Sequence, residues 1–249
     1  MSFEGAIRIN GSPIEELGFS VCHPGMRVSA PEPIIKFQRM PGGSVAVDTT
    51  LRDEDGNAPI KERTVTLTMC TIGHVEDIAH MQANLAALTG SLMTIQCGNA
   101  PTWRGYASFK NWQPVFSFGN TAKYKCDLVL TAEPFAYGAV ATVSVGGDVR
   151  VAVDGDRPCW PHFKLKATSD EVIINCSSSS KLLTFEGLSD GATLEIESTP
   201  QARVARMNGT IVVPTLQSDF FPLIPGIVDL SVTGASGVMS FTPLFVYGA

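Results

Sequence analysis

Alternating apolar and polar positions dominate the chain and predict short β-strands. In Arg63–Met69 the apolar residues fall on one face and the threonines on the other, and the same alternation runs through Asp127–Thr131. A period of two is typical of strands with one buried face. Asn10-Gly11 and Asn208-Gly209 are preferred tight-turn pairs, because both central positions of such a turn need positive φ. The sequence therefore predicts a mostly β chain with many hairpins.

One segment, Val75–Thr89, has the period of an α-helix instead. Its apolar stripe recurs at three- and four-residue spacing. The stripe consists of Ile78, Met81, Leu85 and Leu88. Glu76 and Asp77 lie in the first turn, where the helix dipole favours anions, and Gly90 follows at a position where glycine commonly ends helices. A helix is expected at about residues 75–90.

A break at Glu133-Pro134 divides the chain. Proline cannot donate to a strand ladder, and two aromatic residues, Phe135 and Tyr137, follow it directly. The pattern before the break contains the one helix, and the pattern after it is all β. We therefore expect an α+β, barrel-like domain at residues 1–138 and an all-β sandwich at 139–249, with the two aromatic residues at the junction.

Length and charge narrow the class of protein. A chain of 249 residues is near the size at which one core gives way to two domains. The net charge is −6, made up of −2 for residues 1–138 and −4 for 139–249, and neither half has a basic run. The negative charge and the lack of a basic run exclude sequence-independent binding of nucleic acid. They are better suited to the wall of a channel through which DNA passes. No signal peptide and no apolar stretch long enough for a membrane helix is found.

The residues that commonly carry chemistry are scattered. The six cysteines are Cys22, Cys70, Cys97, Cys126, Cys159 and Cys176; they form no CxxC pair and are expected to be free, buried thiols. The four histidines show no metal-ligand or catalytic spacing. Asp53–Asn57 begins like a calcium loop, but the glycine and glutamate that an EF-hand needs at positions six and twelve are missing. No enzyme activity, cofactor or metal is expected.

One aromatic residue offers an alternative function. Trp160 lies beside Arg157 and His162 at a proline-rich corner, and an exposed aromatic face with polar neighbours is what a sugar site needs. Glycan binding through the second domain is therefore kept as an alternative. A wall hydrolase using Glu195 and Glu197 is disfavoured, because both residues fall on an exposed strand face.

Several motifs resemble, in their order and spacing, the distal tail proteins (Dit) of long-tailed, non-contractile phages. They are the turn Arg39-x-Pro41-Gly42, the strand entry Lys61-x-Arg63, the segment Trp103–Tyr106, the break with Pro134, Phe135 and Tyr137, and Phe221–Gly226. The resemblance covers nearly the whole chain. Members often continue the first turn with charged residues, whereas this chain has Gly43-Ser44, so an ion pair across a ring is not expected there.

The resemblance implies a structural virion protein at the tail tip, assembled in the host cytoplasm. In that family the first domain forms a hexameric ring around the DNA channel, and a galectin-like sandwich lies outside the ring. The ring joins the tail-tube protein to a tail-tip, lysin-like protein, supports host adsorption and, in many members, carries receptor-binding proteins. The residues implied as interface or junction are Arg39, Pro41, Gly42, Lys61, Arg63, Pro134, Phe135 and Tyr137.

Overall fold

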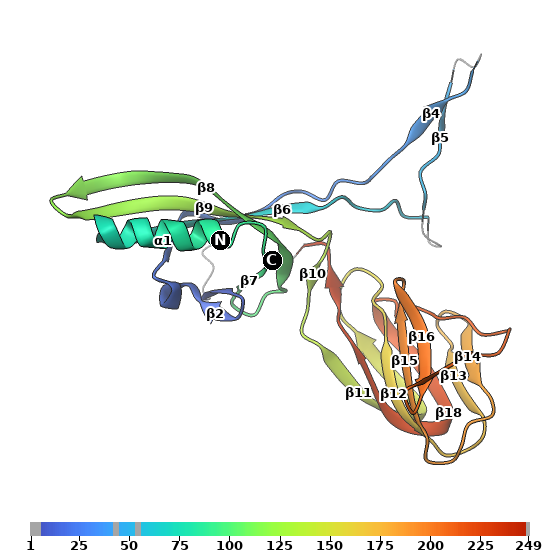
Figure 1. The fold of residues 1–249 in the computed structure, drawn as a ribbon. Helices are drawn as coiled ribbons and strands as arrows, with labels where there is room; N and C mark the ends of the chain where they lie inside the picture. The colour runs from blue at the N-terminus through green and yellow to red at the C-terminus, as the bar shows by residue number, and fades with distance from the viewer. Residues whose placement is uncertain (1–5, 42–44, 53–55, 248–249) are drawn as a thin grey trace. The chain divides into compact units, whose positions relative to one another are not determined.

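The computed structural model describes residues 6–41, 45–52 and 56–247. Its backbone contacts divide the chain into two units: Met1–Ala136 together with Val246–Ala249, and Tyr137–Phe245. The described residues form two large antiparallel sheets, one α-helix and one short 3-10 helix (Figure 1). The mostly β fold class with a single α-helix is confirmed.

A seven-stranded sheet forms the first unit, in the order β2-β1-β7-β8-β9-β6-β3. The strands are β1 (Ile7–Ile9), β2 (Ser12–Pro13), β3 (Ser20–Val28), β6 (Arg63–His74), β7 (Leu92–Cys97), β8 (Trp103–Phe118) and β9 (Thr121–Ala132), and η1 (Ile14–Leu17) follows β2. β6 pairs with β9 along its whole length. The long central strands β8, β9 and β6 thus form the frame of the unit.

The alternation in β6 and β9 places the core of the first unit. Val65 lies opposite Leu130 and Leu67 opposite Leu128, and all four side chains are fully buried. β8 lies close to β9 at Gly105, because a Cβ added to this glycine would meet the backbone oxygen of Thr131. Burial of facing apolar pairs stabilises the register of the sheet, because a one-residue shift would expose all of them.

Helix α1 (Val75–Ala87) begins directly after β6 and ends close to the predicted boundary. Gly90 has a φ of 84°, and its N–H donates to the carbonyl of Ala107 at 2.7 Å, so the glycine turns the chain back to the sheet. Ile78 is the buried member of the apolar stripe. In Figure 1 the helix lies along β8 and β9. None of the helices in the described ranges is long and apolar enough to cross a membrane.

The second unit is built around one long strand, β18 (Gly226–Phe241). One edge of β18 pairs with β11 (Ala141–Val153); along the other edge its first half pairs with β13 (Val172–Cys176) and its second half with β12 (His162–Ala167). Gly234, at φ 76°, lies where the partner changes. The remaining strands are β14 (Lys181–Phe185), β15 (Thr193–Thr199), β16 (Ala202–Met207), β17 (Thr210–Val212) and the short pair β10 (Ala136–Tyr137) and β19 (Leu244–Phe245).

Bending a single sheet around β18 encloses the core of the second unit. Phe163, Phe185 and Phe221 are fully buried there, and the rings of Phe163 and Phe221 meet edge to face with centroids 6.5 Å apart. Strand β12 shows how the core is supplied, because inward and outward residues alternate strictly along His162–Ala167. The second unit is all β, as the regular strand spacing predicts, and its main strands belong to one eight-stranded sheet.

The prediction of six free thiols is wrong for two of them. Cys22 on β3 and Cys70 on β6 form a disulfide, with Cα atoms 5.7 Å apart. The two strands are neighbours in the sheet, and this separation is within the range that a disulfide spans. The other four cysteines are buried and free. Burial raises the pKa of the Cys126 thiol to about 12 and that of Cys159 to about 11, so neither is a ready nucleophile.

Candidate functional site

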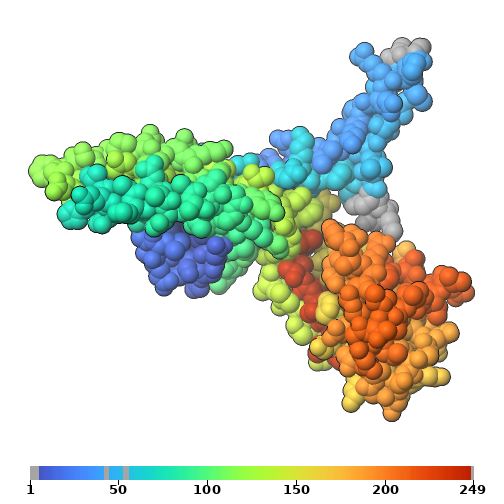
Figure 2. Space-filling model, in the orientation of Figure 1, coloured from blue at the N-terminus to red at the C-terminus, as the bar shows by residue number. Residues whose placement is uncertain are grey.

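The first candidate surface is the arm, defined here as residues 29–62, between β3 and β6. It contains the hairpin of β4 (Phe37–Arg39) and β5 (Ala46–Asp48). Pro33 pairs with Ile60 at its base, where Ile34 N–H donates to the Pro59 carbonyl at 2.7 Å. Figure 2 shows the arm as a narrow projection from the first unit. The hairpin is therefore held at its base by main-chain bonds and does not join the large sheet.

The arm exposes many large apolar side chains. They are Ile35, Phe37, Met40, Val45, Val47 and Leu51. Phe37 is 66% exposed and Leu51 82% exposed. Single exposed apolar residues are ordinary on protein surfaces, but a group on one narrow hairpin marks an interaction site. The arm is therefore a candidate interaction surface.

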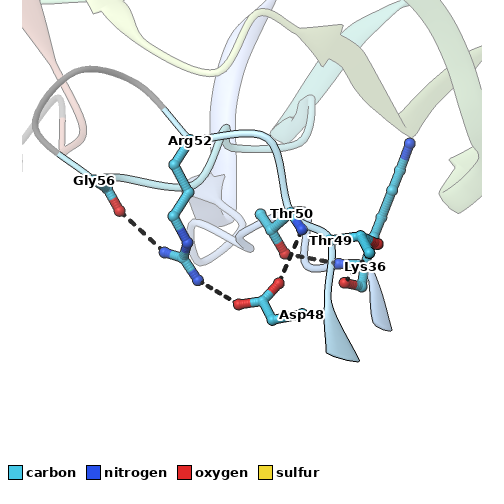
Figure 3. Close-up of polar contacts among 6 residues, drawn as sticks. All are labelled: Lys36, Asp48, Thr49, Thr50, Arg52 and Gly56. Atoms are coloured by element: carbon cyan, nitrogen blue, oxygen red, sulfur yellow. Dashed lines mark hydrogen bonds and ion pairs between the residues drawn. The ribbon is translucent and has the colours of Figure 1, made fainter. Parts of the chain in front are cut away.

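A polar network fixes the arm next to β5, and Figure 3 shows it. Arg52 donates to the Asp48 carboxylate at 2.8 Å and to the Gly56 carbonyl at 3.0 Å. Thr50 accepts a hydrogen bond from the Lys36 N–H, and its own N–H donates to Asp48 at 2.9 Å. Hydrogen bonds from Thr50, followed by those from Arg52, lower the pKa of Asp48 to about 2. The exposed apolar residues are therefore presented on a defined backbone.

The second candidate surface is a cleft between α1 and the sheet, with a volume of about 410 Å³. We call it the α1 cleft. Met69 and Leu128 of the sheet and Met81 and Leu85 of the helix line it, together with Asp77 and Asn84 at the helix surface. The apolar stripe of the helix is only partly covered, because Met81 and Leu85 are half-buried and Leu88 is 42% exposed. The helix thus packs on the sheet along one side of its stripe and leaves the other side open.

The outer half of the β8–β9 hairpin is a third apolar surface, at the same end of the unit as the start of α1. Val115, Phe116 and Phe118 are exposed there, Phe118 at 87%. Trp112 and Tyr124 pack together across the two strands, with ring centroids 5.8 Å apart. The Val75 N–H donates to the Asn120 carbonyl at 3.1 Å, which ties the start of α1 to the hairpin turn. The outer β8–β9 hairpin is therefore held against the start of the helix.

Arg63, expected from the resemblance to mark an interface or junction, is a buried cation with only 2% of its surface exposed. Its Nε donates to the Ser29 carbonyl at 2.8 Å, its NH1 group donates to the Val246 carbonyl at 2.9 Å, and its NH2 group makes a further contact to Ser29. The guanidinium carbon lies 5.3 Å from the Trp103 ring centroid and 5.9 Å from that of Tyr247. Burial lowers the pKa of Arg63. Arg63 therefore anchors the returning C-terminal segment within the first unit.

The other residues implied by the resemblance are dispersed. Arg39 and Pro41 lie exposed on the arm, while Gly42 lies outside the described residues, as do Asp53–Asp55 of the calcium-like loop. Lys61 is exposed and pairs with Glu32 at 3.0 Å. Pro134, Phe135 and Tyr137 are half-buried. Within residues 6–41, 45–52 and 56–247, no three histidine, cysteine or acidic side chains gather as a metal site would require.

Trp160, the glycan candidate, is half-buried on the second unit. The Arg203 guanidinium carbon lies 5.5 Å from its ring centroid. A sugar stacking on this side of the ring would have to displace the arginine. Sequence reasoning missed Arg203, because the two residues come from different strands and loops.

Comparisons with known proteins agree with the fold. Residues 154–245, from the segment after β11 to β19, match the family model described as "Siphovirus-type tail component, C-terminal domain". The matched segment lies in the second unit and covers less than half of the chain, which is similar to this family over those residues. No curated protein sequence matches the chain.

Two solved structures are similar to the chain. The crystal structure of the SPP1 Dit (gp 19.1) protein is 18% identical, with a TM-score of 0.67 over 96% of this chain and 98% of that one. It shows the same fold in both units. A chain of the phage P2 baseplate in its activated conformation with calcium is 7% identical, with a TM-score of 0.39 over 89% of this chain and 91% of that one.

Proposed function

We propose that this chain is the hub of a long, non-contractile phage tail. Six copies close a ring through the first unit, around the DNA channel, and the second unit lies on the outside. The ring joins the tail tube to the tail-tip, lysin-like protein and supports host adsorption and receptor-binding proteins. The family match at residues 154–245 supports this proposal, as does the fold shared with a protein described as a "paradigm of hub adsorption apparatus in Gram-positive infecting phages".

The observation that carries the proposal is the apolar surface of the arm. A monomer gains nothing by holding Phe37 and Leu51 in water on an ordered hairpin, since burying a side chain of this kind contributes about 1.5–3 kcal/mol. The α1 cleft and the outer β8–β9 hairpin supply a second apolar surface on the same unit. Two different surfaces that face each other between copies make a head-to-tail contact, and such a contact closes into a ring when the rotation allows it.

Ring formation is tested on the full chain by light scattering coupled to size exclusion and by negative-stain imaging, across a range of concentrations. We expect six-fold rings. The double variant Phe37→Ser with Leu51→Ser removes two exposed anchors and should shift the assembly towards monomers. Val213→Ser with Leu216→Ser is the matched control, because both residues are exposed on the second unit and should leave rings intact. A wild-type chain that stays monomeric and also fails to co-assemble with its tail-tube partner would overturn the proposal.

Glycan binding through the second unit is the alternative, and a glycan array separates the two functions. A hub that acts by geometry alone shows no binding that depends on Trp160. Loss of a glycan signal in Trp160→Ala, with the fold intact, would favour the alternative.

A further inference from the structure

We infer that the face of the first-unit sheet turned away from α1 binds the sugar-phosphate backbone of duplex DNA without reading its sequence. We call this face of β3, β6, β8 and β9 the outer face. The inference rests on the proposed function for the source of the ligand, which is the DNA of the channel. The chemistry of the contact depends only on the side chains of the outer face.

The strand register separates the outer face from the side that carries the helix. Met69 and Leu128 line the α1 cleft, so α1 covers their side of the sheet. Neighbouring residues of a strand point to opposite sides, so Thr68 and Asp127, which lie opposite each other on β6 and β9, belong to the outer face. Lys110 of β8 is the partner of Asp127 on its other side. The outer face therefore consists of strand residues that the helix does not cover.

Charge divides the first unit by element. The seven strands of the sheet, all within the described residues, contain seven Lys/Arg and one acidic residue, a net of +6. Helices η1 and α1 contain four acidic residues and no Lys/Arg, a net of −4. Residues 1–138 as a whole have a net charge of −2, so the positive charge is confined to the sheet. The sequence shows no basic run because these cations come from separate strands and meet only in the fold.

Four of the seven cations lie together on the outer face. Lys123 and Lys125 alternate with core residues on β9, and Lys110 lies opposite Asp127 on β8. Arg27 of β3 lies opposite Thr66, which is on the same side of β6 as Thr68. Four positive charges and the one negative charge of Asp127 give this group a net charge of +3.

Asp127 is held by hydrogen bonds within the sheet. Its carboxylate accepts from the Thr68 hydroxyl and from the Asn111 amide, each at 2.7 Å. Burial acts to raise the pKa of Asp127, but these hydrogen bonds and the charges of Lys125 and Arg27 lower it. Asp127 therefore stays ionised among the cations and weakens their attraction for an anion. A modest net attraction suits DNA that moves along the wall of a channel.

The size and the polar groups of the outer face fit a phosphate backbone. Six residues of β9 separate the row of Lys123 from the row of Arg27, which is about 20 Å at roughly 3.4 Å per residue. Each strand of a duplex presents one phosphate per about 3.4 Å of axis, so several phosphates fall within this length. Thr64, Thr131 and Tyr106 form a further row of hydroxyl groups, which commonly contact phosphates.

A lipid surface fits the outer face less well. Membrane binding of this kind needs apolar side chains that enter the lipid beside the cations. The exposed aromatic residues Phe116 and Phe118 lie towards the hairpin turn, at one end of the face, whereas Lys110 and Arg27 are surrounded by polar groups. The distribution of charge therefore favours DNA.

Fluorescence anisotropy of the full chain with a labelled duplex tests this contact. About three phosphates neutralised per copy predict that the logarithm of affinity falls with the logarithm of salt at a slope of about −2.7. Between about 50 and 200 mM salt this slope amounts to roughly a 40-fold loss of affinity. The slope should be steeper where several copies of a ring contact one duplex. Binding that does not depend on salt would overturn the inference.

Charge variants locate the contact. Lys110→Gln with Lys123→Gln removes two of the four cations and should reduce the slope by about 1.8. The matched control is Lys164→Gln with Lys166→Gln, which changes the net charge equally but at exposed positions of β12 in the second unit, and should leave the slope unchanged. Asp127→Asn should tighten binding about two- to five-fold, the size of one exposed charge interaction. Equal losses in the two lysine pairs would overturn the inference.

Competitors and assembly state separate the remaining outcomes. Polyglutamate that displaces the duplex at equal charge would overturn the assignment to a phosphate backbone. Binding to vesicles of phosphatidylglycerol and phosphatidylcholine in place of the duplex, lost in Phe118→Ser, would assign the face to lipid instead. Rings that bind no DNA would overturn the inference and leave the proposed ring standing. A chain that binds DNA as expected but never forms rings would support the outer face and overturn the proposed ring.

Discussion

Arg63 is the residue whose replacement should damage the first unit most clearly. Arg63→Met keeps the length of the side chain and removes its donors. The Val246 carbonyl then loses a buried hydrogen bond from a charged group, and Ser29 loses two contacts. A hydrogen bond to a charged group contributes about 1.5–3 kcal/mol, and each lost contact with the Trp103 and Tyr247 rings adds about 0.5–1 kcal/mol. The guanidinium also recovers hydration in the unfolded chain, so a net loss of about 2–4 kcal/mol is expected.

Urea denaturation of the full chain measures this loss. Of the three tryptophans, Trp103 and Trp112 lie in the first unit and Trp160 in the second, so a Trp160→Phe background makes fluorescence report on the first unit alone. With an m-value of about 2 kcal/mol per molar urea, the midpoint should fall by roughly 1–2 M. Arg63→Lys should lose about half as much, because an ammonium can keep one carbonyl but not the forked geometry.

The matched control is Arg104→Met. Arg104 lies in the same unit, but its side chain is half exposed, and its ion pair with Glu133 is 3.6 Å long. Exposed pairs contribute about 0–1 kcal/mol, so this variant should unfold close to wild type. If Arg63→Met matched the control within about 0.5 kcal/mol, Arg63 would not anchor the C-terminal segment.

Three further changes test separate parts of the first unit. Gly105→Ala should destabilise the first unit in the same urea assay, because the new Cβ meets the β9 backbone, whereas Gly73→Ala has room and should change little; equal midpoints would refute the close approach. Reduction of Cys22–Cys70, which are 48 residues apart, should lower stability by about 2–4 kcal/mol, and Cys22→Ser should make the protein insensitive to reductant; a wild type indifferent to reductant would contradict this. Carbon-detected NMR titration should give a pKa of about 2 for Asp48, raised in Thr50→Val and in Arg52→Met; titration near the usual 3.8 would show that the network in Figure 3 does not form. Because the pKa of Asp48 is lowered on folding, its contribution to the order of the arm is present above pH 3.8 and is lost as the pH falls towards 2.

Local patterns were enough to predict the frame of the first unit. Alternation in β6 and β9 identified Val65, Leu67, Leu128 and Leu130 as one face, and the structure buries all four. The helical stripe and Gly90 likewise placed α1 within a few residues of its observed end. These features depend on side chains close together in sequence, whose periods decide which face is apolar.

Contacts between distant segments could not be predicted in this way. In the sequence, Arg63 is a polar residue at the start of a predicted strand. Its burial depends on a hydrogen bond to the Val246 carbonyl, which is 183 residues away. The disulfide between Cys22 and Cys70 depends on β3 lying next to β6, which no spacing of single cysteines reveals. Trp160 was expected to be an exposed ring, but the structure places Arg203 beside it. Each case needs the fold first, because the partners come together only through sheet topology.

The arm shows a second limit of prediction from the sequence. Its hairpin is formed by two short strands, β4 and β5. An alternating pattern predicts that the apolar face of a strand is covered, but it does not identify the molecule that covers this face. In the second unit, residues of the same chain cover the apolar faces of the strands, whereas the apolar residues of the arm stay exposed. The difference between a core strand and an assembly strand therefore lies in whether the folded unit itself buries the apolar face of the strand.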